Sequence, residues 1–245
     1  NNWKTGVKRM EEALKREGIQ DPVMEIFSPS RINWMATRMG IVLGLSLDLT
    51  TNDPDDNKPW DFNNPKKRQK ALKMVRGKQA LLVVGSPMCT AFSQLQNMNK
   101  GKMSEEKQKQ MVKEGREHLK FCCELYNTQL EQGRYFLHEH PLSAKSWEEP
   151  YMKDLMAKNG VRKVAGDMCC FGMFQEGQEG IQLVKKAIGF LTNAECIGRE
   201  LSQRCEGFHR HIRLVNGKAK RAEVYPDELC ARILKGLVKQ MQQDN

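Results

Sequence analysis

The chain has 245 residues, which is enough for one α/β domain with a substantial core. It carries 40 Lys and Arg against 30 Asp and Glu, and the resulting formal net charge of +10 suits a polyanionic partner such as nucleic acid. No apolar run approaches the roughly 20 residues that a membrane-spanning helix needs, and no targeting segment is visible at the start, so we expect an intracellular protein without membrane contact. Because the chain opens abruptly at Asn1-Asn2-Trp3, we expect a fragment of a longer polypeptide with other domains.

Eight cysteines lie inside apolar or helical segments, at positions 89, 122, 123, 169, 170, 196, 205 and 230. A small secreted domain would instead place its cysteines in a loop-rich, stapled pattern. The cysteine pattern therefore indicates a reducing compartment, which is the nucleus if the source is eukaryotic.

In the first half of the chain, amphipathic patterns alternate with short apolar runs. We expect an N-terminal helix over 3–18 within the segment 1–20, and a helix that Ser30 caps and that ends near Met39. The apolar runs predict strands over 23–27, 41–49 and 80–84, and a basic helix is expected over 66–76.

In the second half, a lysine-rich loop over 100–113 leads into a long helix over 114–132. The pattern then predicts strands over 134–141 and 187–192, and a further strand that the segments 161–164 and 168–171 flank. It also predicts helices over 151–159 and 227–242 and a loop over 175–180. This alternation predicts a single α/β domain over 1–245, built as a doubly wound, mostly parallel sheet with helices on both faces.

The segment Gly85-Ser86-Pro87-Met88-Cys89 follows the buried strand expected over 80–84. Open α/β sheets place their chemistry just past the carboxyl ends of such strands. Pro87 stiffens the approach and Gly85 lets the backbone pass close to a ligand, so the Cys89 thiol is a candidate nucleophile. The alternative is a buried thiol after a simple turn.

Two further strand ends carry polar residues, Phe27-Ser28-Pro29-Ser30 and His138-Glu139-His140-Pro141. Pro87-Met88-Cys89 stands between these two segments in the chain, and Phe171-Gly172 and Thr192-Asn193 follow later. The order of these motifs resembles that of the cytosine-5 DNA methyltransferases over about residues 24–235. The likeness is greatest to the short phage-like and retroelement-associated forms. The resemblance implies a Rossmann-like methyltransferase fold, here without a separate target-recognition domain.

By this resemblance, Cys89 is the thiolate that adds to carbon 6 of cytosine, and Glu139 is the carboxyl group that assists at ring nitrogen 3. S-adenosylmethionine is the implied methyl donor and DNA the implied partner, with RNA as the alternative; the base must leave the stack to react. The residues implied for the methyl donor are Phe27, Ser28, Ser30, Asp48, Asp61 and Pro87. Those implied for the base are Ser86, Thr90, Ser93, His140, Lys185 and Lys186.

The sequence also departs from the family pattern. The family's first motif is rich in glycine, whereas no glycine stands here between Phe27 and Gly40, and Pro29 removes an amide donor. His140 replaces the family's asparagine. These departures favour an alternative, namely a catalytically silent nucleic-acid-binding module of a mobile-element polyprotein. A thiol-dependent enzyme that acts on a free nucleotide is a third hypothesis.

Histidines and cysteines of zinc-binding type stand at His138, His140, Cys205, His209 and His211, but their spacing matches no tight zinc signature. We therefore assign no metal and leave zinc open. The adjacent pairs Cys122-Cys123 and Cys169-Cys170 are interpreted as core residues. The basic runs over 66–70, 100–113, 209–213 and 218–221 are candidate phosphate contacts.

Overall fold

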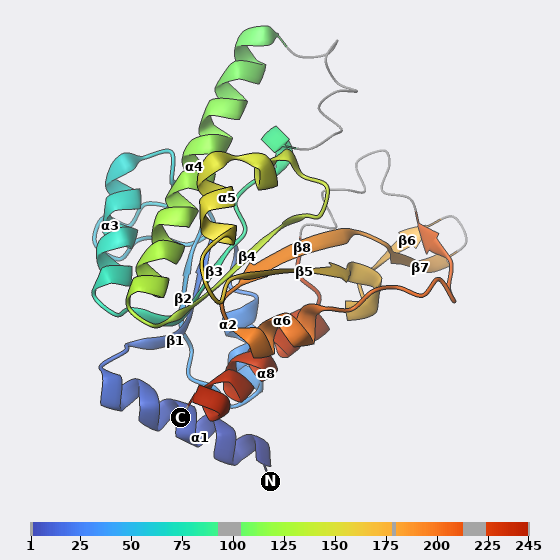
Figure 1. Cartoon of the computed structure of the whole chain (residues 1–245). Coiled ribbons are helices and arrows are strands. Elements are labelled where there is room, and N and C mark those ends of the chain that lie inside the picture. Colours follow the sequence, from blue (N-terminus) through green and yellow to red (C-terminus); the bar gives the residue numbers. More distant parts are fainter. Residues whose placement is uncertain (1, 93–103, 178–179, 213–223, 245) are drawn as a thin grey trace.

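A computed structural model describes residues 2–92, 104–177, 180–212 and 224–244 (Figure 1). It shows an α/β fold with a six-stranded mixed sheet, which confirms the expected α/β class. The strands of this sheet are β1 (Asp21–Ile26), β2 (Leu45–Leu47), β3 (Ala80–Gly85), β4 (Tyr135–Pro141), β5 (Arg162–Asp167) and β8 (Ala187–Thr192). The helices are α1 (Asn2–Glu17), α2 (Ile32–Arg38), α3 (Pro65–Arg76), α4 (Glu105–Glu131), α5 (Pro150–Met156), α6 (Glu195–Leu201) and α8 (Asp227–Asp244).

The sheet has the strand order β2-β1-β3-β4-β8-β5. Strands β2, β1, β3 and β4 run parallel to one another, whereas β8 is antiparallel to both of its neighbours. From β1 the chain moves outward to β2 and then crosses back to β3 on the other side of β1. The strand order therefore reverses between β1 and β3, and open α/β sheets bind ligands in the crevice at the carboxyl ends of such a pair.

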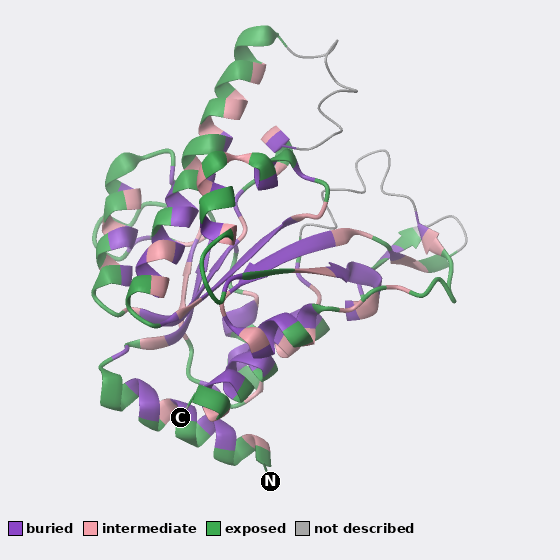
Figure 2. Cartoon of the chain, in the orientation of Figure 1, coloured by how far each residue is buried: buried purple, intermediate pink, exposed green. Residues whose placement is uncertain are grey.

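Two hydrophobic clusters cover the two faces of the sheet (Figure 2). Leu82 and Val84 of β3 pack with residues of α1, α2, α6 and α8, whereas Val83 packs with residues of α3, α4 and α5. Every residue of β3 is buried, because successive side chains of a strand point to opposite faces and both faces are covered. The continuous apolar run over 80–84 is the sequence pattern expected of a strand that is buried on both faces.

A second, smaller sheet has the order β6-β7-β9 and consists of β6 (Phe174–Gly177), β7 (Gly180–Val184) and β9 (His211–Ile212). Strands β6 and β7 pair in an antiparallel arrangement, so the loop expected over 175–180 was wrong for most of that segment. The glycine and glutamine content suggested a loop, but edge strands with few buried side chains carry too weak an apolar pattern to be recognised.

Helix α6 (Glu195–Leu201) had no sequence-based prediction, and other elements differ from theirs. Helix α4 begins at Glu105 rather than 114, because Ser104 caps it and two glutamates occupy its first turn. Its first turns project beyond the body of the fold (Figure 1). Strand β2 covers three residues instead of 41–49. Ser30 does not cap α2, because the side chain of Glu25 fills that role, as described below.

In the described part of the chain, no helix combines the length and the apolar character that crossing a bilayer requires.

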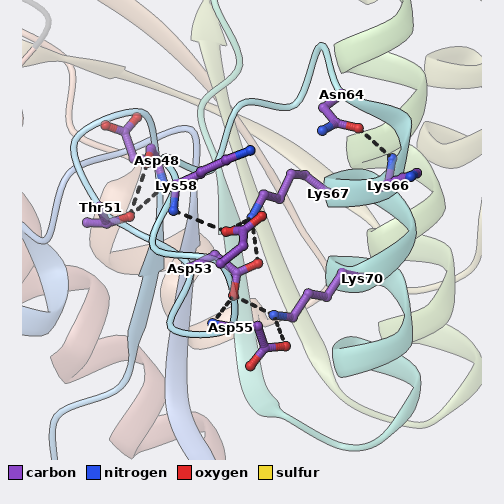
Figure 3. A network of polar contacts seen from close by, with 10 residues as sticks. Asp48, Thr51, Asp53, Asp55, Lys58, Asn64, Lys66, Lys67 and Lys70 are labelled. Carbon is purple, nitrogen blue, oxygen red and sulfur yellow. Dashed lines mark hydrogen bonds and ion pairs between the residues drawn. The ribbon is translucent and has the colours of Figure 1, made fainter.

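The loop between β2 and α3 is fixed to α3 by a network of charged groups (Figure 3). The buried carboxylate of Asp53 accepts from the Lys67 ammonium at 2.7 Å and also from Lys70, and Lys67 contacts Asp56 at 2.7 Å. Burial by itself raises the pKa of Asp53. The hydrogen bonds from the two lysines have together a larger effect than burial, and they lower the pKa to about 2. This network holds the segment that carries Trp60, Asp61 and Phe62.

We predict that Asp53→Asn lowers the free energy of unfolding by about 3 kcal/mol, because two lysines lose a buried counter-charge. The stabilisation from Asp53 is fully present above the unfolded pKa of about 3.9, and it is lost as the pH falls through the folded pKa of about 2. Urea unfolding between pH 2 and 7 measures both effects. Asp154→Asn, an exposed change on α5, is the control, and equal stability of the two variants at pH 7 would contradict the role of Asp53.

Candidate functional site

The carboxyl ends of four parallel strands lie side by side at one edge of the main sheet. Beyond β1, the Phe27 amide donates to the Leu47 carbonyl of β2 at 3.1 Å, and beyond β3 the Ser86 amide donates to the Ile26 carbonyl of β1 at 3.1 Å. Gly85 of β3 pairs in register with His138 of β4. The three segments that sequence analysis singled out, after β1, after β3 and in β4, therefore meet at this edge.

Phe27 stands at the switch point between β1 and β3 with a left-handed backbone, at φ 59°. A bulky residue in this region is a strained outlier, and such strain gathers at functional sites. Its half-buried ring lies 4.9 Å from the ring centroid of Phe62 and 4.9 Å from that of His118. The conformation therefore directs the ring of Phe27 into an aromatic cluster formed with α4 and the loop before α3.

A cavity of about 120 Å³ opens beside this aromatic cluster. Met88 and Ala91, which flank Cys89 and Thr90 in the chain, both contribute to its wall. The other lining residues are Phe27, Leu49, Trp60, Asp61, Phe62, Asn63, Met111, Glu114, Gly115 and His118. The cavity thus adjoins the Cys89 segment and is walled mainly by aromatic and apolar side chains, a lining typical of sites for flat heterocycles.

His118 is one of the polar residues that line this cavity. Among the described residues, its buried Nε2 atom has no hydrogen-bond partner. Burial and the charge of Arg68 lower the pKa of His118, which favours the neutral ring. Leaving a buried ring nitrogen without a partner costs free energy, so His118 is the lining residue with a hydrogen bond still to make.

The loop after β1 is held by the buried carboxylate of Glu25. It accepts from the backbone amides of Arg31, Ile32 and Asn33 at 3.2, 3.0 and 3.0 Å, and from the Ser46 hydroxyl at 3.0 Å. The free amides at the start of α2 are therefore satisfied from within the protein. Ser28 and Ser30 follow in this loop; Ser28 is buried with its hydroxyl 3.4 Å from Glu25, and Ser30 is exposed.

The Cys89 segment is fixed through the residue two positions before it. The Pro87 carbonyl accepts from His140 Nε2 at 2.8 Å, and His140 Nδ1 lies 2.7 Å from the Ser146 hydroxyl. Burial lowers the pKa of His140 to about 4, so the ring is neutral. Because a carbonyl only accepts, the ring proton is on Nε2, and Nδ1 accepts from Ser146. Cys89 itself is half-buried beyond this anchor.

Glu139 of β4 is buried beside Tyr225, whose hydroxyl donates to its carboxylate at 3.2 Å. The same hydroxyl contacts the Ser86 side chain, so Tyr225 connects the segment after β3 with β4. Burial raises the pKa of Glu139, and the positive charge of Lys186 and the hydrogen bond from Tyr225 offset this only in part. Glu139 is thus biased toward its protonated form, which can donate a hydrogen bond.

Tyr225 is placed by a contact from the opposite side of the site. The Arg31 guanidinium donates to its carbonyl at 2.7 Å and to the Asp227 carboxylate at 3.0 Å. Helix α8 is in this way fastened to the start of α2, and Tyr225, just before α8, reaches the ends of β3 and β4. Sequence reasoning missed Tyr225 and His118, since no local pattern reports contacts between segments so far apart in the chain. It also missed Glu25, whose amide partners are close in the chain, because a carboxylate inside an apolar strand is no recognised capping pattern.

The remaining candidate residues lie at differing distances from this centre. Asp48 and Asp61 are near the cavity, but the Asp48 carboxylate already accepts from the backbone amide and the hydroxyl of Thr50. The charge of Lys186 lowers the pKa of Glu139. The charge of Lys185 acts instead on His211, whose pKa is lowered by burial, by His209 and by Lys185. Thr90 is exposed at the start of the short 3-10 helix η1 (Thr90–Phe92), and Ser93 lies outside the described residues.

Of the five zinc-type residues, His138 and His140 lie together on β4, with ring centroids 4.6 Å apart and with polar partners of their own in Tyr126 and Ser146. Cys205, His209 and His211 gather elsewhere.

No protein-family model matches this chain, and a search of curated proteins found no match either.

We predict that Tyr225→Phe raises the pKa of Glu139 further above its ordinary value, because the variant loses a hydrogen bond that stabilises the carboxylate. Carbon-13 NMR titration of labelled glutamate carboxyl groups measures this, with Glu139→Gln identifying the resonance. Tyr135→Phe, which removes a hydroxyl that contacts Asp244 instead, is the matched control. A Glu139 pKa that stays constant or falls in Tyr225→Phe would show that Tyr225 does not act on this carboxyl group.

Proposed function

We propose that this chain is a methyltransferase-like domain with a doubly wound Rossmann-type sheet, and that it transfers a methyl group from S-adenosylmethionine to carbon 5 of cytosine in DNA. One observation carries the proposal: Met88 and Ala91, on either side of Cys89 and Thr90, line an aromatic cavity, while Ser86, three residues before Cys89, is joined through Tyr225 to Glu139. A nucleophile, an acid and a pocket for a heterocycle are thereby supported by one edge of the sheet.

Cys89 is the nucleophile in this proposal. Carbon 5 of cytosine attacks an electrophile poorly until a thiolate adds to carbon 6, which turns the ring into an enamine. Cys89 is half-buried rather than sealed in the core, and its segment is anchored by the hydrogen bond from His140 to the Pro87 carbonyl. Loss of the carbon 5 proton to water after methyl transfer breaks the bond between sulfur and carbon 6 and returns the thiolate.

Glu139 assists this addition as an acid. Attack on carbon 6 places negative charge on the pyrimidine ring, and a proton shared with ring nitrogen 3 stabilises it. Burial raises the pKa of Glu139 above its ordinary value, which favours the protonated form that such a donor needs. The charge of Lys186 and the hydrogen bond from Tyr225 act in the opposite direction and favour release of the proton.

At about 120 Å³ the cavity suits one flat part of the methyl donor rather than the whole molecule. Bound S-adenosylmethionine supplies the methyl group on a positively charged sulfur. Phe27, Phe62 and Trp60 line the cavity with aromatic rings against which its adenine would pack, and His118 lines the same cavity. Asp61 and Glu114 add negative charge to the lining, which favours a cationic ligand.

Basic residues around the site suit a DNA partner. Lys107, Lys109 and Lys113 are exposed on the projecting first turns of α4, and the whole chain has a formal net charge of +10. The charge of Lys186 reaches Glu139 and lowers its pKa, and in this proposal the same ammonium contacts a phosphate or the extruded base. Further domains of a longer polypeptide would add contacts for a target sequence.

A silent nucleic-acid-binding module is the second candidate, and the loop after β1 favours it. Glu25 occupies three amides at the start of α2, and Pro29 has no amide to offer, so this loop presents few backbone donors to a bound cofactor. This candidate predicts DNA binding without methyl-donor binding.

We predict that an oligonucleotide carrying 5-fluorocytosine forms a covalent complex with the protein in the presence of S-adenosylmethionine. Fluorine replaces the proton that carbon 5 must lose, so the bond from Cys89 to carbon 6 persists on a denaturing gel. Cys89→Ser should trap at least about 100-fold less. Cys170→Ser, another half-buried cysteine, is the control and should trap as the wild type does; equal trapping by Cys89→Ser and wild type would remove Cys89 from the reaction.

We also predict a saturable heat when S-adenosylmethionine is titrated into the wild-type protein, and about fivefold weaker binding by Phe27→Ala, because an aromatic contact is worth about 1 kcal/mol. Trp34→Ala removes an exposed ring that packs on Arg38 instead, and it should bind normally. No heat from the wild type, together with retained binding of a DNA duplex, would favour the silent module.

A further inference from the structure

Four side chains of metal-ligating type converge away from the candidate site. Cys169 lies in the 3-10 helix η4 (Met168–Phe171) after β5, Cys205 lies in the segment after α6, and His209 and His211 lie at the approach to β9. One ligand atom from each of the four lies within 4.8 Å of every other. We propose that these residues bind one zinc ion in a structural site.

The distances agree with a tetrahedral ion. Bonds of about 2.3 Å to sulfur and about 2.0 Å to nitrogen place a sulfur and a nitrogen ligand about 3.5 Å apart. Cys205 Sγ lies 3.6 Å from His209 Nε2 and 3.4 Å from His211 Nε2. The Cys169 ligand atom lies within 4.8 Å of the same atoms, so all four ligands are spaced to surround one ion.

The ligand set selects zinc over other common ions. Two thiolates neutralise the charge of a divalent cation, and sulfur with imidazole nitrogen is the donor set of Cys₂His₂ zinc sites. Because four protein ligands complete the tetrahedron, no position is left for water or substrate, and the site is structural. It is independent of the proposed methyl transfer.

Neighbouring groups already orient the Cys205 ligand. Its backbone amide donates to the buried Asp167 carboxylate at 2.9 Å, and Arg204 contacts the same carboxylate at 3.2 Å. The Gly207 amide lies 3.4 Å from Cys205 Sγ and donates toward it, which stabilises negative charge on the sulfur. Such contacts around the ligands are how proteins hold metal sites in shape.

The position of the site explains what the metal does for the fold. The small sheet β6-β7-β9 leaves Phe174 and Ile181 exposed, so it buries too little apolar surface to be held by a core alone. Zinc would fasten β9 to η4 and thus to the end of β5. The Met168 amide, next to Cys169, donates to the Lys186 carbonyl at 3.0 Å, so the same site steadies the backbone of Lys186.

The test is the zinc content of the full chain purified with a reductant and without added metal. Elemental analysis should find about one zinc per chain in the wild type and less than about one fifth of that in Cys169→Ser, Cys205→Ser and His209→Ala. Cys170→Ser, adjacent to a ligand but outside the group of four, should keep its zinc. Less than about one fifth of an equivalent in the wild type, or equal zinc in Cys205→Ser and wild type, would overturn the proposal.

Cobalt replacement tests the same site without relying on variants that could unfold. The wild type loaded with cobalt should show a sulfur-to-metal charge-transfer band and the intense visible bands of a tetrahedral ion. Weak octahedral bands without a sulfur band would contradict the assigned ligands, as would a Cys169–Cys205 disulfide found by mass spectrometry in the protein kept under reductant.

Discussion

The Tyr225 hydroxyl is the contact on which the proposed site depends. It touches Ser86 after β3 and Glu139 in β4, and its own backbone is held by Arg31 at the start of α2. Tyr225, just before α8, thereby links the segment after β3 with Glu139 of β4. Without it, Glu139 would be a buried carboxyl group lacking its tyrosine partner, and the segment from Ser86 to Cys89 would lose one of its anchors.

Two buried carboxylates do comparable work on either side of the cavity. Glu25 satisfies the amides at the start of α2 and so fixes the loop after β1, while Asp53 gathers Lys67 and Lys70 and so fixes the loop that carries Trp60 and Phe62. The two loops are therefore fixed by buried carboxylates, one hydrogen-bonded to backbone amides and the other paired with lysines. Phe27, with its left-handed backbone, stands at the start of the loop that Glu25 holds.

Much of the architecture could be predicted from local patterns. The double burial of β3 leaves a continuous apolar run over 80–84, and β8 matched its expected bounds of 187–192. The start of α4 was missed because the lysines of this segment suggested a loop. In the structure Ser104 caps the helix, which therefore begins at Glu105. Cys205, His209 and His211 could be grouped from their spacing, and the structure brings them together. The contacts of Tyr225 with Glu139 and of Cys169 with this group could not be predicted, because they form only through tertiary folding.

The central claim is that Cys89 and Glu139 act on one and the same base. A crystal structure of the covalent complex with an oligonucleotide carrying 5-fluorocytosine tests it most directly. The account predicts continuous electron density from Cys89 Sγ to carbon 6 of the extruded base, with the Glu139 carboxyl group within hydrogen-bond distance of ring nitrogen 3. A base joined to Cys89 whose nitrogen 3 faces solvent or another side chain, with Glu139 still bound only to Tyr225, would contradict it.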